Sequence, residues 1–69
     1  MNVYIKGEIK LSQFLKIVDL CPTGGMAKFF VKIHKITING REPEGRNAKV
    51  RIGDTVWVDD ALYTIHEKM

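Results

Sequence analysis

The chain has 69 residues, which predicts a single small domain with little core to spare. Apolar residues make up 45% of it and charged residues 28%, a balance typical of a globular domain rather than a disordered chain. No apolar run exceeds three residues, so we expect neither a membrane span nor a secretory leader. The single cysteine, Cys21, excludes an internal disulfide and favours a reducing compartment, the cytoplasm.

The net charge of +3 is distributed unevenly along the chain. Residues 23–53 hold seven basic and two acidic side chains, a net charge of +5. The rest of the chain holds four basic and six acidic side chains, a net charge of −2. A basic central segment in a mildly acidic frame predicts one electropositive face.

The first third of the chain predicts a strand and then a helix. Residues 3–5 are prone to β structure and stop before Gly7, which indicates an edge or closing strand. The apolar residues that follow have the i, i+3, i+4, i+7 spacing of one helical face. They are Leu11, Phe14, Leu15 and Val18. Pro22 ends this helix.

A second helix is expected to begin at Thr23, a good N-cap residue. Its apolar stripe consists of Ala27, Phe30 and Val31, with Met26 and Phe29 widening it. Lys28, Lys32 and Lys35 form a second, basic stripe at i, i+4 and i+7. Such a row is either a solvated face or a binding surface, and spacing alone leaves both interpretations open.

The remainder predicts short strands joined by turns. Residues 36–38 alternate and stop at Asn39-Gly40, the strongest short hairpin signal, while Pro43 limits the returning strand. Residues 44–48 are predicted to form a loop, and Val50 and Ile52 to point inward. Gly53 then begins a turn, and residues 55–58 and 62–65 form a second hairpin. The expected fold class is α+β, with two helices packed on a small, mostly antiparallel sheet.

Residue types that carry catalysis or bind metals are few. His34 and His66 have no Cys, His or carboxylate at a metal-ligand spacing, and His34 is expected at a helix C-terminus. Cys21 is predicted to be a partly buried structural thiol. The segment GREPEGRN (residues 40–47) has the glycine spacing of a phosphate loop but lacks its lysine and hydroxyl. We therefore predict no enzyme, no cofactor and no bound metal.

Two other features suit an anionic or aromatic ligand. Thr23, Gly24 and Gly25 stand where free N–H groups of a helix start can meet a phosphate, although a flexible turn explains them equally well. Trp57 and Tyr63 are candidate platforms for stacked bases, but a packing role is favoured for both.

Motifs along residues 9–58 resemble the small RNA-binding domain named after small-subunit ribosomal protein S4, which carries the alpha-L motif. The matching pieces are residues 11–16 and 27–32 on the two helices, residues 36–40 at the strand and turn, and residues 53–56. The L-x-Q-F-L-K and T-G-G-x-A-K segments are most similar to short stand-alone bacterial members of the YaaA type.

The chain departs from that family pattern at three places. After Asn39-Gly40 it has Arg41, so the acidic residue of the pattern is displaced to Glu42. His34 stands where the family usually has a glycine, so the resemblance implies a strained left-handed residue there. The arginine-rich loop of the nearer relatives is also thinned.

The resemblance and the charge distribution together predict one RNA-binding domain over residues 1–69. It would recognise structured RNA, ribosomal or transfer RNA-like, through phosphate contacts, with DNA left open as a second ligand. We expect a cytoplasmic monomer. The alternative is a protein-interaction adaptor that keeps the fold without binding nucleic acid. The predicted RNA-binding residues are Thr23, Gly24, Gly25, Lys28, Lys32, Lys35, Asn39, Arg41, Arg46, Lys49 and Arg51.

Overall fold

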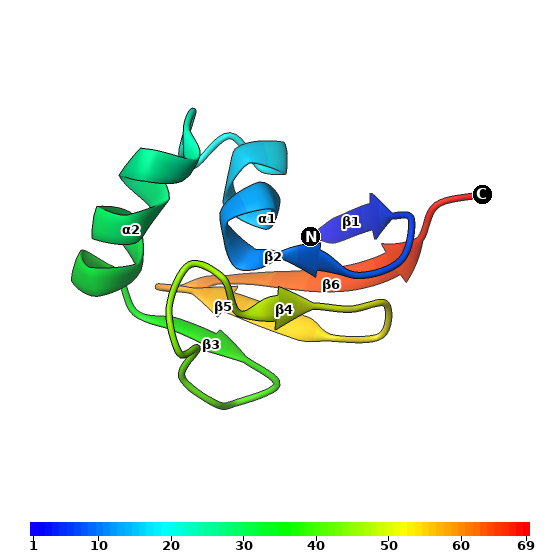
Figure 1. Cartoon of the computed structure of the whole chain (residues 1–69). Helices are drawn as coiled ribbons and strands as arrows, with labels where there is room; N and C mark the ends of the chain where they lie inside the picture. Colours follow the sequence, from blue (N-terminus) through cyan, green and yellow to red (C-terminus); the bar gives the residue numbers. More distant parts are fainter.

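Two helices and six short strands make up the chain in a computed structural model that describes residues 1–69 (Figure 1). In chain order the elements are β1 (Asn2–Ile5), β2 (Ile9–Lys10), α1 (Leu11–Ile17), α2 (Gly24–Ile33), β3 (Ile36–Ile38), β4 (Lys49–Val50), β5 (Thr55–Val58) and β6 (Ala61–Glu67). This is the predicted α+β class. Neither helix is long and apolar enough to cross a membrane.

The main sheet has the strand order β1-β6-β5-β3. The predicted second hairpin is confirmed, because β5 and β6 pair antiparallel across a turn at Asp59 and Asp60. The predicted edge strand is also confirmed, since β1 lies at one end of the sheet, parallel to β6. A second sheet joins β2 to β4, with Ile9 opposite Val50. No sequence pattern predicts this two-residue pairing.

The core lies between α1 and the inward-facing side chains of the sheet. Leu11, Phe14 and Leu15 of α1 are fully buried, as their spacing predicted. The Phe14 ring meets the Tyr63 ring edge to face at a centroid distance of 5.3 Å. Such a pair stabilises beyond the area it buries, so α1 is fixed over β6.

Helix α2 buries a narrower stripe than predicted. Ala27 is fully buried and Phe30 and Val31 are partly buried, which confirms the central stripe. Met26 and Phe29 are exposed, so the expectation that they widen the stripe is wrong. The reason is positional: α2 stands at the end of the layer and packs against α1, with no element over its outer side (Figure 1).

Three sequence predictions are wrong at the ends of α2 and β4. His34 is extended, with φ −106°, because the chain passes directly into β3, so the implied left-handed strain is absent. Lys35 lies beyond the end of α2 at Ile33 and so leaves the helical stripe. Val50 is buried as predicted, but Ile52 is exposed because the chain has already left β4 for the turn at Gly53.

The predicted Asn39-Gly40 turn is confirmed. Both residues have positive φ, 53° and 84°, as a type I′ hairpin turn requires. The return is short: only Arg41 bridges back to Ile38, and Pro43 follows in an irregular loop. The loop after this turn leaves the sheet and hydrogen-bonds to the start of α1.

Candidate functional site

The loop of residues 44–48 is held against the start of α1. The N–H of Leu11 donates to the Ala48 carbonyl at 2.7 Å, and the N–H of Ser12 donates to the Arg46 carbonyl at 2.9 Å. The first N–H groups of a helix have no partner inside it. The loop supplies those partners, so its path is fixed by the helix rather than by its own composition.

Arg46 connects this loop to the start of α2. Its Nη1 donates to the Gly24 carbonyl at 2.9 Å. Thr23 is the N-cap as predicted, and its hydroxyl accepts from the N–H of Met26 at 3.2 Å. A guanidinium has five N–H donors, so this single contact leaves most of them available beside Gly24.

A surface hollow of about 890 Å³ opens between α2 and the loop. Five basic side chains of the predicted set line it: Lys28, Arg41, Arg46, Lys49 and Arg51. Two carboxylates, Glu42 and Glu44, line it as well, so its net charge is +3. These residues come from positions 28–51, and the fold brings them to one place.

Lys32 and Lys35 lie outside this hollow. Both line a smaller neighbouring hollow of about 240 Å³, which shares Glu42 and Pro43 with the larger one. Lys28 and Lys32 remain exposed on successive turns of α2. The predicted row of three lysines is thus a row of two, with Lys35 on the strand side of the helix end.

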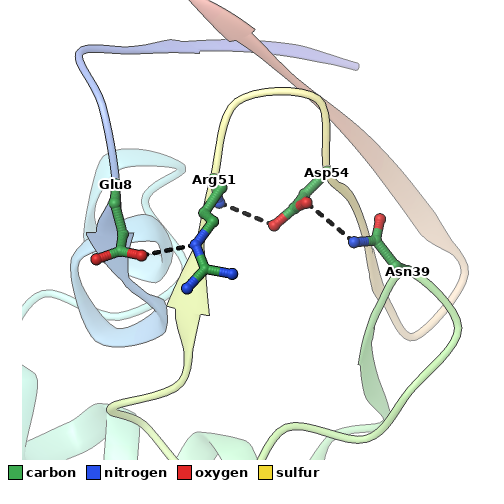
Figure 2. Close-up of polar contacts among 4 residues, drawn as sticks. All are labelled: Glu8, Asn39, Arg51 and Asp54. Carbon is green, nitrogen blue, oxygen red and sulfur yellow. Dashed lines mark hydrogen bonds and ion pairs between the residues drawn. The ribbon is translucent and has the colours of Figure 1, made fainter.

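Asn39 has an internal role that the sequence did not reveal (Figure 2). Its Nδ2 donates to Asp54 Oδ1 at 2.9 Å, and its Oδ1 accepts from the N–H of Thr55 at 2.9 Å. Both polar atoms of the Asn39 side chain are therefore used to close the hairpin against β5.

Arg51 is partly engaged in the same region (Figure 2). Its Nε donates to Glu8 Oε1 at 2.7 Å, and its backbone N–H donates to Asp54 Oδ2 at 2.8 Å. The two terminal nitrogens of its guanidinium make no internal hydrogen bond. Glu8 lies 43 positions away in the sequence, so no local pattern could have indicated the pair.

The cysteine, histidine and aromatic side chains considered as candidates are described by their burial and contacts. Cys21 is buried, as predicted, and burial raises the pKa of its thiol. Tyr63 is buried in the core, as favoured, whereas Trp57 is exposed on the outer face of the sheet beside Thr37. His34 Nδ1 contacts Asp59 Oδ2 at 2.7 Å, and no group of three or more His, Cys, Asp or Glu residues is arranged to hold a metal ion.

Comparison with known proteins identifies the fold family. The sequence model of the S4 domain family matches residues 3–66. A Bacillus subtilis (strain 168) protein described as "Probable ribosome maturation protein RlbA" is 39% identical to the chain over 51 residues. That match covers 74% of this chain and 72% of the relative. Because the family match spans nearly every described element, from β1 to β6, this chain belongs to the S4 domain family.

Proposed function

We propose that this S4 domain is a non-catalytic RNA-binding module that holds a structured RNA by its phosphates. Family membership and the ribosome maturation relative support an RNA-binding or ribosome-related role. We infer further that the RNA is ribosomal, or tRNA-like, and that the protein acts in the cytoplasm. The observation that carries the proposal is the Arg46–Gly24 contact, because it joins the basic loop to the start of α2.

The start of α2 suits a phosphate group. The first intrahelical bond runs from the Ala27 N–H to the Thr23 carbonyl, so the N–H groups of Gly24 and Gly25 precede it. Free N–H groups at a helix start favour an anion. A Cβ atom at Gly24 would meet nothing within 4 Å, and a phosphate can therefore approach the backbone.

The basic side chains extend this contact in two directions. Lys28 and Lys32 continue along α2, while Arg46, Lys49 and the free end of Arg51 continue along the loop. Such side chains neutralise phosphates without reading bases, since the A-form major groove is too narrow to admit them. Glu42 and Glu44 lower the local charge, so we expect binding to depend on the shape of the phosphate path and on salt.

A salt titration with a charge-reversed variant tests the proposal. If about four phosphates of a ribosomal RNA hairpin are neutralised, log K against log salt falls with a slope of about −3 to −4. The double variant Lys28→Glu, Lys32→Glu should abolish binding. The matched control is Lys6→Glu, Lys68→Glu, which changes the net charge equally at the far end of the sheet and should bind almost normally.

Mapping backbone NMR shifts during the same titration locates the surface. Changes confined to residues 24–35 and 46–51 support the proposed face. Unchanged affinity in the α2 double variant overturns it. Failure of the wild-type protein to bind RNA at physiological salt would instead favour the adaptor function.

A further inference from the structure

Helix α2 carries an apolar row next to its lysine row. Met26, Phe29 and Ile33 are 53%, 65% and 77% exposed. Phe29 follows Lys28 directly and stands three positions before Lys32, and side chains three apart are neighbours on a helix surface. The lysines proposed to hold phosphates are therefore bordered by exposed apolar side chains along most of the helix.

The Phe29 ring has no aromatic partner. Its neighbour Phe30 differs, because its ring stacks on His34 at a centroid distance of 3.9 Å and an interplanar angle of 21°. Long helical side chains lean toward the helix N-terminus, over residues i−3 and i−4. For Phe29 these are Met26 and Gly25.

The space beside Gly25, one turn before Phe29, is open. A Cβ atom at Gly25 would meet only the Thr23 hydroxyl, at 3.9 Å, and nothing else within 4 Å. Of these two positions Gly25 carries no side chain and lies beside the helix start proposed for a phosphate, while the Met26 side chain is itself exposed. The exposed Phe29 ring therefore has room for a flat group to pack against it.

We propose that the RNA bound by this face carries an unpaired nucleotide whose base stacks on Phe29, an inference that rests on the proposed function. Every base has a flat apolar face, so an exposed ring beside phosphate-binding lysines suits a base of any sequence. Bases inside a duplex are already stacked and cannot reach the ring. The preferred ligand is therefore a duplex with a bulge, loop or frayed end, rather than a fully paired helix.

The exposed lysines at the border of the row favour RNA over a protein as its occupant. A protein that covered only the apolar side chains would leave Lys28 and Lys32 beside its edge and would need acidic groups there. An RNA strand supplies the negative charge and the flat apolar surface in one ligand.

Two RNAs and one substitution test this inference. The RNAs are a blunt hairpin and the same hairpin with a single bulged 2-aminopurine, and the variant is Phe29→Ala. The wild type should bind the bulged RNA roughly 5- to 150-fold more tightly and quench the 2-aminopurine fluorescence. Phe29→Ala should bind both RNAs equally, at the affinity of the blunt hairpin, without quenching.

Tyr4→Ala is the matched control, because Tyr4 is also an exposed aromatic residue but lies on β1, where its ring stacks on His66. It should behave as the wild type. Equal wild-type affinity for the two RNAs, or a bulge preference that survives in Phe29→Ala, overturns the stacking while leaving RNA binding intact. Absence of binding to both RNAs overturns the proposed function together with the inference.

Discussion

His34 Nδ1 lies 2.7 Å from Asp59 Oδ2, so the residue that ends α2 is tied to the turn between β5 and β6. Asp59 makes two further hydrogen bonds to Lys35, the residue that follows His34. Its Oδ1 accepts from the Lys35 N–H at 3.0 Å, and its own N–H donates to the Lys35 carbonyl at 2.7 Å. These bonds fix the orientation of the C-terminal end of α2 relative to the sheet. They therefore set the position of Lys28 and Lys32 relative to the loop.

The Asp59 contacts predict an acid-dependent part of the stability. The hydrogen bond from His34, followed by that from the Lys35 N–H, lowers the pKa of Asp59 below its ordinary value. A carboxyl whose folded pKa lies below its unfolded pKa stabilises the fold above the unfolded value, near pH 4, and loses that effect as the pH falls through the folded value. Asp59→Asn should remove this contribution.

Thermal melts between pH 7 and pH 2 check this expectation. Asparagine tolerates the positive φ of 53° at this position, so the substitution removes the charge without new backbone strain. The wild type should be the more stable protein at pH 7, and the difference should shrink in acid. Asp60→Asn is the control, since the Asp60 side chain makes no hydrogen bond or ion pair. A difference between Asp59→Asn and wild type that stays constant with pH would contradict the assignment.

Asn39 is expected to act in folding rather than in RNA contact. Asn39→Ala loses three hydrogen bonds and places alanine at a φ of 53°, at a total cost of about 3–4 kcal/mol. Asn39→Gly loses the same bonds without the left-handed penalty and should be less destabilising. Urea denaturation measures both. RNA affinity well below the unfolding transition should match the wild type, and a selective loss of affinity would restore Asn39 to the binding surface.

The structural features that depend on local residue spacing could be predicted from the sequence. The burial of Phe14 follows from its helical spacing, and the turn at Asn39-Gly40 follows from two residues that tolerate positive φ. The exposure of Phe29 could not be predicted, because it depends on the absence of a neighbouring element beside α2. The roles of Asn39 and Arg51 were equally hidden, since their partners Asp54 and Glu8 are 15 and 43 positions away.

Leu15 should be one of the residues on which the fold depends most. It is fully buried on α1, and truncation of a buried leucine removes apolar contacts and leaves a cavity, at a cost of about 2–5 kcal/mol. A domain of this size has little stability to spare, so Leu15→Ala is expected to be largely unfolded at 37 °C. Leu20→Ala is the matched control, because Leu20 is partly solvent-exposed and its truncation should cost less than about 1 kcal/mol. Circular dichroism melts distinguish the two, and similar melting temperatures would contradict the burial of α1.

Gly25 offers a substitution for which stability and RNA affinity should change in opposite directions. Gly25 is helical, and the new Cβ of Gly25→Ala would make only an ordinary contact with the Thr23 hydroxyl. Alanine is the better helix former, so the free energy of unfolding should rise by about 0.5–1 kcal/mol. The added methyl group also stands where a phosphate is proposed to approach the helix start. Affinity for the RNA hairpin should fall roughly tenfold, comparable to one lost hydrogen bond to a charged group.

Urea denaturation and a binding titration on the same preparation measure the two quantities. A variant that merely damaged the fold would lower both, whereas a more stable protein with undiminished affinity would show that the phosphate does not bind at Gly25.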